Sequence, residues 1–414
     1  MPKPTDLGGA SPPRMTRARL RHTLLCAWVM AAWAASAPLQ AHARPLATLP
    51  ALGDPTKVSV SGISSGAAMA VQYAVAHSAS VVGVGAIAGP GWGCAQGRVS
   101  QAINTCMCTR EAPPSTLTQA RQMAASGSID KLTAGKPRAL SRAFVFHSPD
   151  DATVRAPSGD ASIDFLQGFI GRTPTVDRGN AVDGSNRAGH GIVSPQGQDS
   201  CQTSARDSSY VRRCGDEDNA RDVLHALMPD VAPDASQRVD DVPEGDVQAF
   251  DQTPFIDEVL ADKPYIAPDA LWWYVYPYRS ERRQRLDMAA TGYLYVPPAC
   301  RSAGARCGVH VALHGCKQDA KAFALTTGYL RWAQLYRQVI VYPAIQPGTN
   351  PVSESCSAGK VPVAADAAWV QPNPNGCWDW WGYLDGVERT RYLSQAAPQV
   401  QVIERIVRAL TRPR

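Results

Sequence analysis

The sequence holds a serine in a setting that could make it a nucleophile. Ser64 stands in the pentapeptide Gly62-Ile-Ser-Ser-Gly66. A serine hydroxyl attacks an ester only when a base takes its proton and a sharp turn exposes it, and glycines two residues to either side let that turn pack closely. The pattern indicates acyl-transfer chemistry at Ser64, although Gly-x-Ser-x-Gly also arises by chance in a chain of 414 residues.

The base for such a serine would be a histidine, and the chain has eight. His190, between Gly189 and Gly191 in "NRAGHGIVSP", lies in a loop pattern from which an imidazole could swing onto a serine. A surface-loop histidine is the alternative interpretation. The other seven have simpler roles: His22 and His42 in the leader, His77 and His225 in helical patterns, His310 and His314 in and after a strand pattern, and His147 just before the acid candidates.

The acid that orients the histidine is expected after a strand between the serine and the histidine, as in α/β-hydrolases. The segment "AFVFHSPDDATV" supplies Asp150 and Asp151 at such a strand end. One of them would orient the imidazole and the other would be solvated. The residue types alone do not distinguish the two.

An oxyanion hole needs two backbone N–H donors. One would come from Ser65, directly after the nucleophile, and the other from a His-Gly loop that normally follows an earlier strand. In this chain "HVALHGCKQ" provides His314-Gly315-Cys316, about 250 residues after Ser64. An ordinary strand-end turn is the alternative. A circular permutation explains both the late loop and the scarcity of strands before Ser64, because the C-terminal third would then supply the opening strands of the sheet.

The elements needed to position these residues can be read from the hydrophobic pattern. A strand at 57–61 and an alanine-rich helix at 66–77 flank the serine, and short apolar runs at 80–89, 142–148, 307–315 and 338–343 indicate buried parallel strands. The fold class predicted is therefore α/β: a circularly permuted α/β-hydrolase with a mostly parallel sheet and helices on both faces. We expect one catalytic domain over residues 44–414, crossed by an exposed, acidic, proline-rich connector at about 228–254.

The N-terminal residues 1–43 are expected to be a signal peptide region, with Met15 as an alternative start. A basic stretch precedes the apolar run "TLLCAWVMAAWAASA", and "AHA" before Arg44 is a small-x-small cleavage signal. A membrane anchor is the rival, but the run is short for one and no apolar run of about 20 residues follows. We expect a secreted, extracellular protein, with the periplasm as the alternative, and no membrane anchor.

The composition excludes several other classes. A hydrophobic fraction of 44% and a charged fraction of 19% are ordinary for a globular protein. The net charge is +5, but Arg14, Arg17, Arg19, Arg21 and Arg44 lie in or beside the leader. The mature chain is thus near neutral, so no nucleic-acid partner is expected. We expect a monomer.

The cysteines indicate disulfides. The chain has eleven, of which Cys26 lies in the leader, and the remaining even number in a secreted chain favours disulfides. Spacing suggests three local pairs: Cys94–Cys106, Cys201–Cys214 and Cys300–Cys307. A zinc site at Cys106-Met-Cys108 is the rival, but no nearby Cys/His pair has finger-like spacing, so no metal is expected.

Two other signals carry less. Residues 83–88 loosely fit a Gly-x-Gly-x-x-Ala dinucleotide fingerprint, but "GPGWGC" follows instead of a helix, so no cofactor is expected. The aromatic run "NPNGCWDWWGY" at 373–383 is either a buried core cluster or an exposed apolar wall for a greasy substrate.

Several separated motifs resemble those of the single-domain, circularly permuted extracellular poly(3-hydroxybutyrate) depolymerases. They cover most of the chain from about Leu46 onward and follow that family's order: "VSVSGISSGAAMAVQ", "HSPDDATV", the Gly-His loop with "DSSYVRRCGDEDNA", "TGYLYVPPAC", "HVALHGCKQ", "TGYLRWA", "VIVYP" and "NPNGCWDWWGY". Their agreement makes the resemblance far more specific than the serine pentapeptide.

The resemblance implies a role for each candidate. Ser64 corresponds to the nucleophile, His190 to the general base, and Asp151 to the acid, since it stands three residues before Val154 as in the family's Asp-x-x-Val. The backbone amides of Ser65 and Cys316 would form the oxyanion hole.

The resemblance also implies contacts around the site. Trp378 corresponds to a tryptophan that lines the substrate crevice, and Cys316 would be bridged to Cys377. Cys108 and Cys356 have no family counterpart and are expected to pair with each other. The chain departs from the family pattern after "SSG", where it has two alanines in place of Gly-Tyr, and after His190, where no aromatic follows; these departures bear on the exact substrate.

The sequence thus predicts a secreted serine esterase that hydrolyses poly(3-hydroxybutyrate), or a related short-chain polyhydroxyalkanoate, through an acyl-enzyme. A secreted esterase for hydroxybutyrate oligomers or for other esters, such as aromatic ones, is the nearer alternative. A non-catalytic binding protein that uses the aromatic run as its surface is the alternative from a different class.

Overall fold

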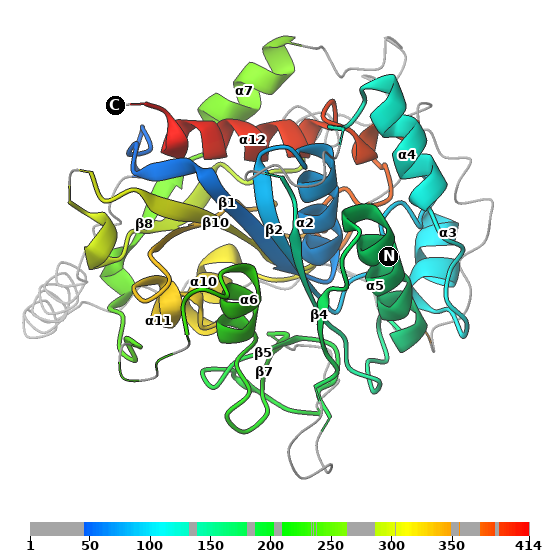
Figure 1. Cartoon of the computed structure of the whole chain (residues 1–414), viewed down its shortest axis with the longest axis horizontal. Helices are drawn as coiled ribbons and strands as arrows, with labels where there is room; N and C mark the ends of the chain where they lie inside the picture. Colours follow the sequence, from blue (N-terminus) through cyan, green and yellow to red (C-terminus); the bar gives the residue numbers. More distant parts are fainter. Residues whose placement is uncertain are drawn as a thin grey trace, which may run out of the picture. The chain divides into compact units, whose positions relative to one another are not determined.

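Eight strands from both halves of the chain form the central sheet (Figure 1). Across the sheet they run in the order β4 (Thr175–Asp177), β3 (Arg142–Phe146), β2 (Val81–Ile87), β1 (Gly53–Ile63), β10 (Cys307–Leu313), β11 (Gln338–Tyr342), β9 (Thr291–Tyr295) and β8 (Val247–Asp251). Strand β9 is antiparallel to both of its neighbours, and the other pairings are parallel. The sheet is therefore mostly parallel, as the apolar runs predicted.

The coordinates are a computed structural model that describes residues 45–131, 139–179, 187–202, 209–232, 234, 236, 238–262, 286–302, 304–348, 356, 373–385 and 389–413. Residues 45–414 form one compact unit. The signal peptide region expected at 1–43 lies outside the described residues. In the ranges described, no helix combines the length and the apolar character that crossing a membrane requires.

Strand order confirms the permuted arrangement. Strand β1, which ends directly before Ser64, lies between β2, which follows it in the chain, and β10, which comes from the last third. Beyond β10 the sheet continues through β11, β9 and β8, all later in sequence than β1. The half of the sheet that seemed to be missing before Ser64 is thus supplied by the second half of the chain, and the predicted fold class is confirmed.

Helices cover both faces of the sheet because the central strands have apolar side chains on both sides; every residue of β10 and β11 is buried. One face packs against α2 (Ser65–Ala76), α4 (Leu117–Ser126), α5 (Ala156–Ile170), α7 (Thr253–Asp262) and α12 (Pro398–Thr411). The other packs against α6 (Asn219–Leu227), α10 (Ala320–Thr326) and α11 (Tyr329–Ala333). Figure 1 shows α12 and α2 on one side of the sheet and α6, α10 and α11 on the other.

The remaining elements are short. A small second sheet joins β5 (Ile192–Val193), β7 (Val211–Arg213) and β6 (Asp199–Ser200), in that order. Helical turns are found at α3 (Val99–Gln101), at the π-helical η1 (Ala102–Met107), and at the 3-10 turns η3 (Glu244–Asp246), η4 (Pro298–Cys300) and η6 (Arg391–Leu393). The small sheet matters for function because it holds the loop that bears His190.

Five disulfides cross-link the described part of the chain: Cys94–Cys106, Cys108–Cys356, Cys201–Cys214, Cys300–Cys307 and Cys316–Cys377. These are the five pairs named from the sequence. Two of them span large sequence separations, 248 residues for Cys108–Cys356 and 61 residues for Cys316–Cys377. The Cys108–Cys356 bridge joins the C-terminal third of the chain to its first third, and the Cys316–Cys377 bridge joins two segments within the C-terminal third.

The acidic connector is shorter and less exposed than the sequence led us to expect. Residues 247–251 of the predicted connector form strand β8, and the side chain of Phe250 is wholly buried. Strand β8 pairs with β9, and Leu46 bridges to Phe250 from its other side. Its sequence, "VQAFD", lies among acidic and proline residues and becomes a strand through pairing with a distant segment.

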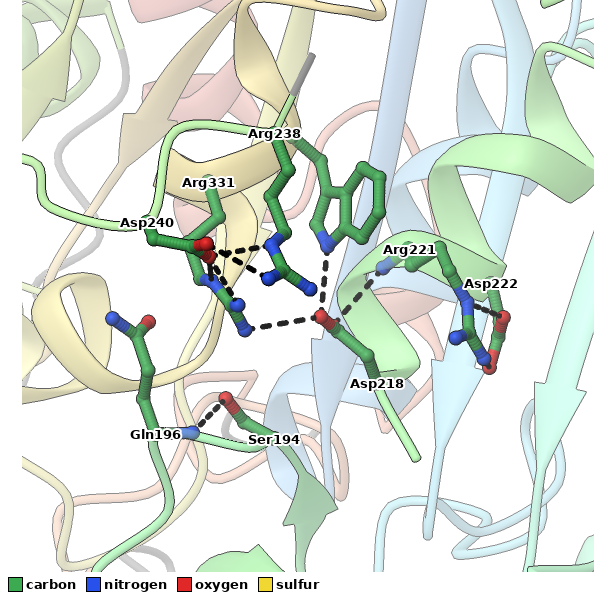
Figure 2. Close-up of polar contacts among 9 residues, drawn as sticks. Ser194, Gln196, Asp218, Arg221, Asp222, Arg238, Asp240 and Arg331 are labelled. Atoms are coloured by element: carbon green, nitrogen blue, oxygen red, sulfur yellow. Dashed lines mark hydrogen bonds and ion pairs between the residues drawn. The ribbon is translucent and has the colours of Figure 1, made fainter. Parts of the chain in front are cut away.

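A network of charged side chains also docks part of this connector, as Figure 2 shows. The Arg331 guanidinium on α11 donates to Asp240 at 2.5 Å and lies 3.6 Å from the buried Asp218 carboxylate at the start of α6. Arg238 pairs with the same Asp240 and lies over the Trp332 ring, 5.8 Å from its centre. The connector is therefore clamped to helices α6 and α11 at these residues.

Candidate active site

Ser64 occupies the sharp turn between β1 and α2. Its backbone has φ 55° and ψ −119°, a conformation that a residue with a side chain adopts only when its surroundings enforce it. A Cβ atom on Gly62 would lie 2.3 Å from the Gly66 oxygen, and one on Gly66 would lie 2.4 Å from the His314 oxygen. Both positions therefore require glycine, and this explains why glycines flank Ser64 in the Gly-x-Ser-x-Gly pattern.

The structure brings Ser64, His190 and Asp151 into one hydrogen-bonded chain. The Ser64 hydroxyl lies 3.0 Å from Nε2 of His190, and Nδ1 of the same ring lies 2.7 Å from Oδ2 of Asp151. An imidazole whose Nδ1–H donates to a carboxylate has Nε2 free to accept the serine proton. These three side chains come from three separate loops, after β1, after β3 and before β5.

Asp151 is the more completely buried of the two acid candidates, with 4% of its surface exposed. Its Oδ1 accepts the backbone N–H groups of Thr153 and Val154, at 2.8 and 2.9 Å. Burial raises the pKa of the Asp151 carboxyl, but the imidazoles of His190 and His147 and the hydrogen bonds lower it more, so the pKa lies below its usual value. The carboxylate is therefore held in its charged form.

His147 lies beside the Asp151 carboxylate and holds the turn that carries it. Its Nε2–H donates to the Val154 carbonyl at 2.7 Å, and the same nitrogen lies 3.9 Å from Oδ2 of Asp151. Burial lowers the pKa of His147, so the ring is neutral at neutral pH. His147 thus fixes the turn that presents the Asp151 carboxylate.

Asp150 lies outside the hydrogen-bonded series of Ser64, His190 and Asp151. Its carboxylate is exposed, 3.8 Å from the Arg187 guanidinium. The choice that the residue types left open is therefore decided by geometry in favour of Asp151 as the partner of His190.

The His190 loop is fastened to the small sheet by a buried arginine. Arg212 on β7 is 1% exposed, and its Nε donates to the His190 backbone oxygen at 2.7 Å. Burial lowers the pKa of this guanidinium, and the nearby Asp199 and Asp151 carboxylates counteract the shift. The next residues along the loop are held as well, because Val193 N donates to the Asn219 side chain at the start of α6.

The His-Gly loop lies beside the serine because of strand register. Gly62 on β1 is opposite Leu313 on β10, so the residues that follow each strand leave the sheet side by side. A Cβ atom on Gly315 would lie 3.3 Å from the Ser64 Cβ. Ser65 is the first residue of α2, where backbone N–H groups have no partner within the helix, and the helix dipole favours negative charge at this end.

Trp378 lies elsewhere than the resemblance implied. Its side chain is wholly buried, and its indole N–H donates to the His314 backbone oxygen at 2.8 Å. The ring packs against the His314 imidazole, 5.7 Å between centres. Trp378 therefore braces the loop that bears Cys316 and does not line the pocket formed by the described residues, because an indole in this position is enclosed by the core.

Further contacts brace the same loop. The Cys316–Cys377 disulfide and the bond from Lys317 N to the Asn375 oxygen, at 2.8 Å, tie it to the segment that carries Trp378. His314 accepts the Ile345 N–H at Nε2, 3.1 Å away. The position of the Cys316 amide is thus fixed from several sides.

The pocket beside the serine is small. It is lined by Ile63, Ser64, His190, Tyr210, Gly315, Cys316 and Gln318. Its volume is about 10 Å³, which is room for about one water molecule. A larger cavity, about 800 Å³, lies elsewhere, between α7 and α12, and its lining contains none of Ser64, His190 and Asp151.

The aromatic run at 373–383 belongs to the core. Trp378, Trp380 and Trp381 are all buried, as is Tyr383. Of the two interpretations of this run, the buried cluster is therefore the correct one, and the run provides no exposed wall. Among the residues that the structure describes, no group of three or more His, Cys, Asp or Glu side chains could hold a metal ion.

Sequence reasoning missed three residues of the site. Gln318 accepts the Gly315 N–H at 2.5 Å and donates to the Ser209 oxygen at 2.8 Å, so it joins the loop of His314, Gly315 and Cys316 to the segment bearing Tyr210. Tyr210 and Arg212 complete the set. All three stand inside motifs quoted for the resemblance, "DSSYVRRCG" and "HGCKQ", but their types alone gave no signal of a role.

Comparison with known proteins gives a consistent result. No family model matches the chain. The chain is 28% identical over 368 residues to a poly(3-hydroxybutyrate) depolymerase of Delftia acidovorans, covering 87% of this chain and 60% of that protein. It is 29% identical over 371 residues to a polyhydroxybutyrate depolymerase of Talaromyces funiculosus, covering 86% and 89%.

Two solved structures are similar to this chain. A PHB depolymerase from Penicillium funiculosum aligns with a TM-score of 0.62 and 26% identity, covering 88% of this chain and 98% of that one. A serine-to-alanine variant of a PHB depolymerase, complexed with an R3HB trimer, aligns with the same TM-score and coverage at 24% identity and supports the fold alone.

Proposed function

We propose that the chain, which is similar to poly(3-hydroxybutyrate) depolymerases, is a serine esterase of that family that hydrolyses the ester bonds of poly(3-hydroxybutyrate) or of a related short-chain polyhydroxyalkanoate. One observation carries the proposal: the hydrogen-bonded chain from the Ser64 hydroxyl through His190 to Asp151. Ser65 follows the nucleophile at the start of α2 and Cys316 lines the same pocket as Ser64, which supports the backbone N–H groups of these two residues as the oxyanion donors.

The proposed reaction has two halves. His190 Nε2 takes the Ser64 proton as Oγ attacks the ester carbonyl, and the amides of Ser65 and Cys316 bind the oxyanion that forms. The carbonyl re-forms, the ester's alkoxide leaves with the proton from His190, and the acyl group stays on Ser64. Water, deprotonated by the same imidazole, then attacks the acyl-enzyme and releases the hydroxyacid. Asp151 holds the ring in the tautomer that both halves need.

A second candidate substrate is a soluble hydroxybutyrate oligomer. An enzyme that works on a polymer surface usually adsorbs through exposed apolar side chains. Among the described residues Val176 is the one exposed large hydrophobic side chain, at 39%. A direct comparison of polymer with soluble oligomers therefore separates the two candidates.

The same proposal includes where the enzyme works. We take residues 1–43 as a secretion signal and 44–414 as a single catalytic domain that acts as a monomer outside the cell, or in a periplasm. Five disulfides support an oxidising compartment, since such bonds are rare in a reducing cytosol.

The experiment compares wild type with Ser64→Ala on three substrates: an emulsion of poly(3-hydroxybutyrate), hydroxybutyrate oligomers and a feruloyl ester. We expect wild type to clear the emulsion and Ser64→Ala to lose at least about 10⁵-fold in kcat with an unchanged circular dichroism spectrum. Wild type should react with a fluorophosphonate, and the variant should not. Activity retained by Ser64→Ala would refute the mechanism, turnover of oligomers alone would favour the second candidate, and turnover of the feruloyl ester alone would overturn both.

A further inference from the structure

Tyr210 has a backbone conformation that needs an explanation. Its φ is 57°, in the left-handed region that favours glycine, and it is a bulky residue. Such residues cluster at sites where the surrounding structure enforces the strain for a purpose. Tyr210 stands just before strand β7, two residues from Arg212, which holds His190.

The neighbours of Tyr210 enforce this conformation from both sides. The preceding carbonyl, of Ser209, accepts a hydrogen bond from Gln318 at 2.8 Å, and the Ser209 hydroxyl donates to Asp199 at 3.0 Å. The Tyr210 carbonyl itself accepts the Ile192 N–H at 3.0 Å. The backbone is therefore clamped between the oxyanion loop and the His190 loop.

The clamped backbone places the ring against the reacting atoms. The Tyr210 ring meets His190 edge-on, with 5.8 Å between centres and 77° between planes. It lines the pocket together with Ser64, Cys316 and Gln318. That pocket has a volume of about 10 Å³, so an acyl group at Ser64 has little room on the side that faces the ring.

From this placement we infer that Tyr210 is the residue that sets the size of the acyl group. The inference rests on the proposed ester hydrolysis at Ser64 and goes beyond it by assigning the choice of substrate to one side chain. The ring excludes acyl chains longer than a short hydroxyalkanoyl unit. The hydroxyl of Tyr210 has no part in this selection; the volume of the ring does.

The test uses Tyr210→Gly, because glycine adopts the left-handed conformation without strain and removes the ring, so that the variant folds. The measurement is kcat/KM for p-nitrophenyl butyrate and p-nitrophenyl octanoate in the full chain. We expect the ratio of octanoate to butyrate to rise at least about tenfold over wild type, since each methylene that gains a pocket contributes to discrimination of this size.

Two matched variants separate the ring from other roles. Tyr210→Phe keeps the ring and should keep the wild-type ratio. Tyr210→Ala removes the ring but retains the strain, so it should give the ratio of Tyr210→Gly with a lower unfolding midpoint.

An unchanged ratio in Tyr210→Gly, or an equal fall for both esters, would overturn the inference, because a residue that only positions His190 affects both substrates alike. A ratio altered by Tyr210→Phe would also overturn it. An enzyme that hydrolyses these soluble esters but no polyester or oligomer would refute the proposed function while leaving the ratio readable, so the two failures are distinguishable.

Discussion

Replacing Asp151 by asparagine tests the site through the tautomer of His190. Oδ1 of Asp151 accepts two backbone N–H groups, from Thr153 and Val154, while Oδ2 accepts Nδ1–H of His190 at 2.7 Å. In Asp151→Asn the amide oxygen must stay on the two N–H donors, because an NH₂ group cannot accept them. The NH₂ group then faces His190 and donates to Nδ1, which leaves the ring proton on Nε2.

A proton on Nε2 removes the acceptor that Ser64 needs. We therefore expect kcat to fall about 10⁴-fold, the loss that the same substitution causes in serine-protease triads, or about 5.5 kcal/mol of transition-state stabilisation. The side chain keeps its shape and stays buried, so the structure should be retained. The assay is kcat for p-nitrophenyl butyrate, with circular dichroism as the check on folding.

Asp150→Asn is the matched control, one residue away with the same chemical change. Its carboxylate is exposed and lies 3.8 Å from Arg187, and such surface pairs contribute at most about 1 kcal/mol to stability. We expect kcat within about twofold of wild type. A loss below tenfold in Asp151→Asn, or an equal loss in Asp150→Asn, would show that the carboxylate does not act through the His190 ring.

Two further predictions concern the supports of the site. Replacing both Cys316 and Cys377 by serine should lower the free energy of unfolding by about 4 kcal/mol, because the bridge closes a loop of 61 residues, and should reduce kcat up to about 10²-fold as the Cys316 amide loosens. The same change at the 7-residue Cys300–Cys307 loop should cost about 2 kcal/mol and leave kcat unchanged. Denaturant midpoints and kcat measure these effects, and equal losses of kcat in the two variants would contradict the prediction. Burial lowers the pKa of His310 to about 3 from 6.5, so in acid the unfolded chain takes up a proton that the folded protein does not. Because of this group, the free energy of unfolding of wild type should fall by about 1.4 kcal/mol per pH unit as the pH falls from 6.5 toward 3. His310→Gln should lack this contribution, and parallel curves of stability against pH for the two proteins would contradict the prediction.

The fold was predictable from the sequence where the signal was local. The strand, turn and helix around Ser64 follow from β-branched, glycine and alanine residues that are neighbours in the chain. Strand β8 was not predictable, because "VQAFD" has no pattern that separates it from the acidic residues around it. Its identity as a strand comes from pairing with β9, more than 40 residues later.

The site shows the same division. Ser64, His190 and Asp151 could be named because few residue types do this chemistry and their order along the chain is informative. The interpretation of Trp378 failed because a tryptophan beside glycines and asparagines fits a crevice wall and a buried brace equally well; only the contact with the His314 carbonyl separates them. Tyr210 was missed because its role depends on a left-handed backbone that no residue type announces.

Strand register explains why a permuted chain can keep the geometry of a hydrolase site. The position of the Cys316 loop beside Ser64 depends on Gly62 lying opposite Leu313. That pairing of β1 with β10 does not depend on how many residues connect the two strands or on their order in the chain. Moving a strand from about 30 to about 250 residues away adds only about 2 kcal/mol to the entropy cost of closing the loop, since that cost grows with the logarithm of length. The Cys108–Cys356 disulfide, which spans 248 residues, constrains the unfolded chain by more than that amount. The late position of the oxyanion loop is therefore compatible with a site as rigid as one built from neighbouring segments.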